Sequence, residues 1–117
     1  MRLLLLLVFV LGCAGNIVEY PEKKEYDRED LVEALRGENF QQKNAAREQL
    51  KKIEPAKRLA ILEVLLKEPD SSTRMLAVSE LSELPLDSVK HILGKVAKDD
   101  PDEEVREFAF MVLTPDE

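Results

Sequence analysis

The segment DPDEEVREFAFMVL, residues 100–113, decides the fold class of this chain. Its apolar residues recur at the i, i+3, i+4 and i+7 spacing of an amphipathic helix: Val105, Phe108, Ala109 and Val112. The acidic residues in front of that stripe are typical of a helix N-terminus, where a side-chain oxygen caps backbone N–H groups and negative charge suits the helix dipole. The segment therefore predicts a turn followed by a capped helix.

The same arrangement occurs at two earlier places in the chain. A basic residue, a small alanine and a leucine stand in one register three times: Lys43, Ala46 and Leu50; Arg74, Ala77 and Leu81; Arg106, Ala109 and Leu113. The steps between the alanines are 31 and 32 residues, and a capping residue stands seven positions before each of them: Asn39, Asp70 and Asp102. A constant period of about 30 residues with two helices per unit predicts a helical solenoid.

The rest of the chain from Asp30 onward is also helical in pattern. Residues 89–96 carry a second amphipathic stripe, and residues 59–66 are apolar on nearly all sides, so we expect the latter helix to be the best-buried element. Strand-like alternation is absent from the sequence. We therefore predict an all-α domain over residues 30–117, a short α-solenoid of about three helix pairs with units at about 30–53, 54–84 and 85–113.

The last unit resembles a known family. Residues 100–106, followed by Ala109 and Leu113, are similar to the turn and second helix of a HEAT or HEAT-like (PBS-lyase-type) repeat, and residues 68–74 are a looser copy. The resemblance implies that the turn aspartate caps the second helix and that the arginine joins a ladder of polar contacts between adjacent repeats. The first unit lacks the Pro-Asp pair and the arginine, as a terminal capping repeat does.

The first residues have the order of a secretory signal. Met1-Arg2 supplies a positive charge, the nine-residue apolar run Leu3–Leu11 follows, and small residues stand at 12–15. As a helix the run would reach only about 14 Å, which is too short to span a bilayer. We predict a signal peptide over residues 1–12 that is cleaved on export, then a flexible tether over residues 13–29.

The single cysteine stands directly after the apolar run. Val10-Leu11-Gly12-Cys13 resembles the lipobox of bacterial lipoproteins, which implies that Cys13 is acylated and becomes the new N-terminus. In that family an aspartate after the cysteine marks the inner membrane, so Ala14 favours a periplasm-facing place at the outer membrane. The alternative is ordinary cleavage at the small residues, which would release a soluble exported repeat protein.

Charge and motifs limit the function classes. Removal of Arg2 with the signal peptide changes the formal net charge from −7 to −8, and an acidic body makes nucleic acid a poor partner. No Gly-rich phosphate loop, nucleophile motif or paired metal ligands occur in the sequence. We therefore expect a protein without catalytic activity, cofactor, metal or small-molecule substrate.

Three groups of side chains could still carry chemistry. His91 is the only histidine, and a lone histidine is more typical of a surface position than of a ligand. The acidic residues within 99–104 could hold a divalent cation weakly, although helix capping already explains them. Four cations, Lys51, Lys52, Lys57 and Arg58, could attract an acidic partner, although a solvated loop is the simpler interpretation.

The last helix has more apolar residues than its own unit needs. The stripe through Phe108, Ala109 and Val112 leaves Phe110 and Met111 pointing elsewhere, and only four residues follow Leu113. We expect these two side chains to contact a partner protein or a second copy, unless they fold back on the preceding helix. The sequence thus favours a membrane-tethered adaptor of the bacterial envelope, with a structural envelope lipoprotein without a specific partner as the alternative.

Overall fold

A computed structural model describes residues 27–115, which form six helices and no strand. The helices are α2 (Arg28–Arg36), α3 (Phe40–Lys51), α4 (Pro55–Leu65), α5 (Ser71–Leu81), α6 (Leu86–Asp99) and α7 (Glu103–Leu113). The all-α prediction is confirmed over this range. The predicted signal peptide, Cys13 and nearly all of the predicted tether lie outside the described residues, but Arg28 and Glu29 already belong to the first turn of α2.

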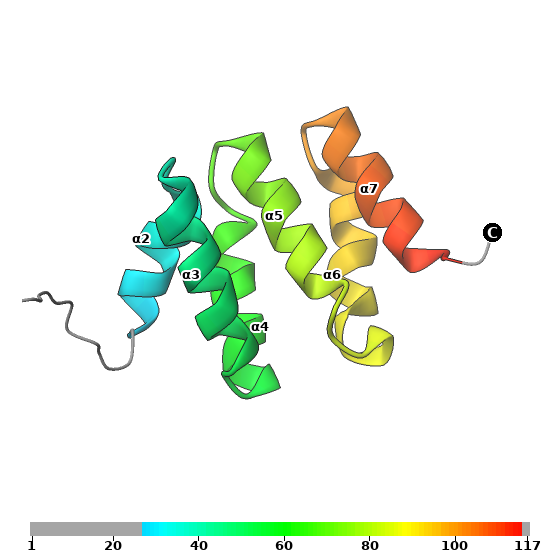
Figure 1. Ribbon diagram of the computed structural model, residues 1–117. Helices are drawn as coiled ribbons and strands as arrows, with labels where there is room; N and C mark the ends of the chain where they lie inside the picture. The colour runs from blue at the N-terminus through cyan, green and yellow to red at the C-terminus, as the bar shows by residue number, and fades with distance from the viewer. Residues whose placement is uncertain (1–26, 116–117) are drawn as a thin grey trace, which may run out of the picture.

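The helices are arranged as three pairs: α2 with α3, α4 with α5, and α6 with α7. In Figure 1 the turns within the pairs lie along one edge and the links between pairs lie along the other. Adjacent pairs contact each other through α2 and α4 in one layer and through α5 and α7 in the other. The pairs match the three units expected from the sequence period.

The repeated alanines lie where the helices come closest. Ala46, Ala77 and Ala109 are each 0% exposed, as are Leu50 and Leu81 one turn later. Leu113, the third member of the leucine series, is only partly buried. No later pair covers it among the described residues, so the register holds but its burial fades at the third pair.

The expectation that α4 is the best-buried helix is wrong. Within α4 only Ile61, Leu62 and Leu65 are buried, whereas α5 buries six residues, among them the charged Arg74 and Glu80. The reason is position: α5 contacts α4, α6 and α7, while α4 has its main contacts with α2 and α5. Apolar composition alone does not show how many neighbours a helix has.

Two of the three predicted caps have the expected geometry. The Oδ1 atom of Asn39 accepts the N–H of Gln42 at 2.9 Å, and Oδ1 of Asp102 accepts the N–H of Glu104 at 2.8 Å. Asp70 makes no such bond and instead accepts the hydroxyl of Thr73 at 3.1 Å. The second copy of the turn is therefore looser in structure as well as in sequence.

Candidate protein-interaction surface

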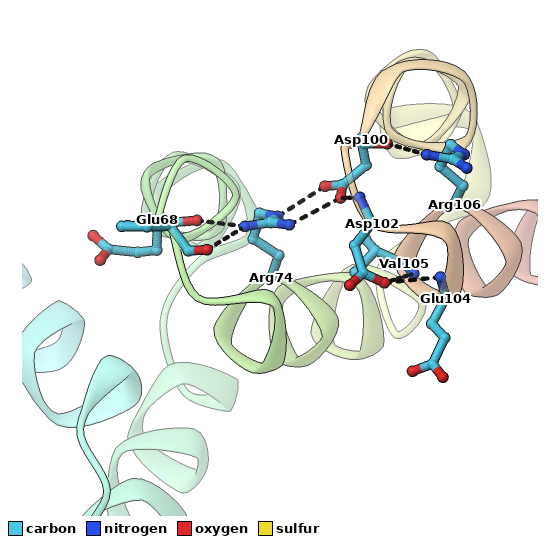
Figure 2. Close-up of polar contacts among 8 residues, drawn as sticks. Glu68, Arg74, Asp100, Asp102, Glu104, Val105 and Arg106 are labelled. Atoms are coloured by element: carbon cyan, nitrogen blue, oxygen red, sulfur yellow. Dashed lines mark hydrogen bonds and ion pairs between the residues drawn. The ribbon is translucent and has the colours of Figure 1, made fainter.

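The turns of the second and third pairs are joined by a buried ion pair, which Figure 2 shows. Arg74 on α5 donates from Nε and Nη2 to the two carboxylate oxygens of Asp100, at 2.9 and 3.1 Å. Its Nη1 donates to the carbonyls of Glu68 and Pro69 at 2.8 and 2.9 Å. The side chains of Arg74 and Asp100 are only 8% and 6% exposed. Bidentate, desolvated pairs of this kind fix geometry strongly.

The same network continues in both directions along the pairs. Arg106 donates from Nη1 to the Asp100 carbonyl at 2.7 Å, six residues back, just as Arg74 donates to the Glu68 carbonyl. At the other end Arg36 donates from Nη1 to the Glu68 carboxylate at 3.1 Å. The ladder of polar contacts implied by the HEAT resemblance is therefore present as a turn network of Arg36, Glu68, Arg74, Asp100 and Arg106.

Both partnered arginines in this network have a raised pKa. For Arg74 the largest cause is the hydrogen bonding to Asp100, which outweighs the opposing effect of burial. For Arg36 the largest cause is the hydrogen bond to Glu68. A raised folded-state pKa stabilises the fold at every pH below the unfolded value and is lost only above it, so both arginines stay charged throughout the physiological range.

A second inter-pair contact joins α3 to α5 and was not predicted. Glu80 is 2% exposed, and its Oε2 accepts Arg47 Nε at 2.6 Å, while Lys51 Nζ lies 3.8 Å from its Oε1. The step of 32 residues places Val112 at the position of Glu80 in the third pair. The only sequence signal was therefore a charged residue in a register position that is apolar elsewhere.

Half of the predicted basic group is engaged in structural contacts. Arg58 donates from Nη2 to the carbonyls of Lys51 and Ile53 at 3.3 and 3.1 Å, which satisfies backbone acceptors after the end of α3. Lys51 pairs with Glu80 and with Glu83. Lys52 and Lys57 are exposed, so two separate cations remain rather than a patch of four.

The acidic turn at 99–104 is also committed to contacts within the protein. The Asp100 carboxylate accepts Arg74 and the N–H of Asp102, and the Asp102 carboxylate caps α7. Within residues 27–115 no group of three or more His, Cys, Asp or Glu side chains is placed to hold a metal ion. A depression between the two turns is lined by Arg74, Asp100 and Asp102, whose polar groups already bond to one another. His91 is exposed.

The residues expected to contact a partner are exposed on α7. Phe110 is 58% exposed and Met111 is 60% exposed, although both are large and apolar. Phe110 follows the buried Ala109 by about 100° around the helix, and Met111 follows it by about 200°. Phe110 therefore lies beside the buried stripe, while Met111 lies opposite to it. Phe40 and Leu86 are the other exposed large apolar residues of the described range.

These features define a helical-repeat protein, built from three similar helix pairs that are joined through repeated polar turns. The family model for HEAT repeats matches residues 28–114, so the chain belongs to the HEAT repeat family. No match was found among the curated proteins or among the solved structures. HEAT repeats are generally scaffolds for protein–protein interaction. Among the described residues no helix is long and apolar enough to cross a membrane.

Proposed function

We propose that this protein is a non-catalytic protein-interaction adaptor of the bacterial envelope, a short α-solenoid held at the membrane by a lipid on Cys13. The observation that carries the interaction part is the exposure of Phe110 and Met111 on α7, because a small domain rarely leaves two large apolar side chains beside each other in water without a use. The HEAT family supplies the same expectation independently.

The tether rests on the sequence of the first residues. An apolar run too short to span a bilayer, followed by the lipobox-like Val10-Leu11-Gly12-Cys13, supports export and acylation. Two or more acyl chains on one cysteine would hold the protein firmly, since a single myristoyl chain binds only marginally. The acidic charge of the body makes headgroup binding by the domain itself a poor substitute.

The anchor is tested by replacing the acylated residue. Cys13→Ala should abolish metabolic labelling with an alkyne-tagged fatty acid, because no other thiol is present to accept the chain. The variant should then accumulate as uncleaved precursor in the inner membrane or appear in the soluble fraction. Labelling that persists in Cys13→Ala would refute lipidation at this residue.

The interaction surface is tested by making its two apolar residues polar. The double variant Phe110→Ser, Met111→Ser should keep its melting temperature within about 5 °C, because exposed side chains contribute little to folding. Cross-linking in intact cells, followed by quantification of the cross-linked species, should show the loss of partner or self-association. The matched control is Phe40→Ser, which removes an aromatic side chain that is 71% exposed at the opposite end of the domain.

An unfolded double variant would contradict this assignment, because Phe110 and Met111 would then belong to the core. A folded double variant with unchanged cross-linking would place the interaction surface elsewhere.

A further inference from the structure

The repeat register gives Phe110 a specific place in the molecule. Steps of 32 and then 31 residues relate Phe110 to Val78 on α5 and to Arg47 on α3. Arg47 points to the following pair, where it bonds Glu80, and Val78 is 0% exposed. This register position therefore faces the next pair along the array. In the third pair the same position is occupied by an exposed phenylalanine.

Arg106 repeats the situation of Arg74 with one difference. Both arginines use Nη1 to bond the carbonyl six residues earlier, in their own turn. Arg74 then directs Nε and Nη2 to the carboxylate of Asp100 in the following pair. Within residues 27–115 no ion pair involves Arg106, whose guanidinium is held in the same way and is partly exposed.

Arg106 and Phe110 are four residues apart, so they lie on one side of α7, one turn from each other. Together they form one half of an inter-pair contact. We propose that this end of the α6–α7 pair binds a helix pair of a partner protein that carries a carboxylate in the turn before its second helix. The carboxylate accepts Arg106, and an apolar residue of the same helix packs on Phe110. This inference rests on the proposed interaction function and names its partner's chemistry.

The size of Phe110 specifies the partner further. In the junction between the second and third pairs the register places Val78 and Val112 at the positions that Arg47 and Glu80 occupy in the first junction. Phenylalanine is larger than valine, and overfilled contacts are destabilising. The partner therefore has a residue smaller than valine at the position opposite Phe110.

A second copy of this chain in head-to-tail order does not fit this description. Steps of 32 residues relate Asp100 to Glu68 and then to Arg36 in the first pair. The first pair thus offers a cation, already bonded to Glu68, where Arg106 needs a carboxylate. Two facing cations repel each other, so charge complementarity favours a different protein.

The test attaches a helix pair of known sequence to the full chain. Residues 82–113 are duplicated after Leu113, which repeats the natural junction after Leu81, and the copied Val112 is changed to alanine to leave room for Phe110. Hydrogen exchange of the α7 amides reports docking, since a covered helix opens less often. The matched control is the same extended chain with the copied Asp100→Asn, which lacks the carboxylate.

We expect docking to slow exchange of the α7 amides by about tenfold or more, with most of that protection lost in the Asp100→Asn copy or with Arg106→Ala in the natural third pair. Unchanged α7 exchange in the extended chain would overturn the proposal. Equal protection with and without the carboxylate would overturn the role of Arg106. Either failure leaves the adaptor function standing, because that function is tested by cross-linking of the natural chain in cells.

Discussion

Asp100→Ala is expected to lower the free energy of unfolding by about 3 kcal/mol, the largest effect of any single change outside the apolar core. The substitution leaves the Arg74 guanidinium desolvated with Nε and Nη2 unpaired, and it also removes the acceptor of the Asp102 N–H. The cost lies at the lower end of the usual range for a broken buried pair, because Arg74 keeps the Glu68 and Pro69 carbonyls.

Urea denaturation of the full chain, followed by far-ultraviolet circular dichroism, measures this difference. The matched control is Lys90→Ala, which removes the exposed ion pair with Asp87, where the side chains are 62% and 96% exposed. That change should stay within about 0.5 kcal/mol, since exposed pairs contribute little. Equal effects of the two substitutions would mean that the turn network does not hold the second and third pairs together.

The repeat could be predicted from sequence because it depends on a few residues with one physical role each. Ala77 and Leu81 recur at fixed positions because close helix approach needs a small residue and a filled contact one turn later. Asp102 could be assigned as a cap from its type and its place before an apolar stripe. These signals are local, so the period of the sequence is enough to find them.

The contacts between pairs could not be predicted in the same way. Arg47 and Glu80 are 33 residues apart and look like ordinary charges on helix surfaces, yet Glu80 is buried. Arg58 was grouped with neighbouring lysines by sequence, whereas its guanidinium bonds the backbone after α3. Which charges are buried depends on how adjacent pairs meet, and a single sequence does not record that geometry.

The exposed pair on α7 lies between these two cases. The apolar excess of residues 108–113 correctly indicated that Phe110 and Met111 have no partner within their own unit, and both are exposed. The sequence did not separate their roles. Only the contacts of Arg47 and Arg74 with the following pairs show that the Phe110 position faces along the array, and Met111 corresponds instead to Ser79 on the outer side of α5.

Ala77→Leu is expected to overfill the contact at the centre of the domain. Ala77 is 0% exposed on α5, which is packed against α4, α6 and α7, so the added carbon atoms have no space without movement of a helix. The expected cost is about 1–3 kcal/mol, and a domain of this size loses about 4–8 °C of melting temperature per kcal/mol. Thermal unfolding of the full chain measures it directly.

The matched control for this change is Ala45→Leu, because Ala45 is exposed on α3 and stands outside the repeated register. Leucine is nearly as good a helix former as alanine, so that variant should melt within about 2 °C of the natural chain. A decrease confined to Ala77→Leu would locate the close approach of the helices at the repeated alanine. If Ala77→Leu melts like the control, α5 has room for a larger side chain, and the repeated alanine does not mark the inter-helix contact.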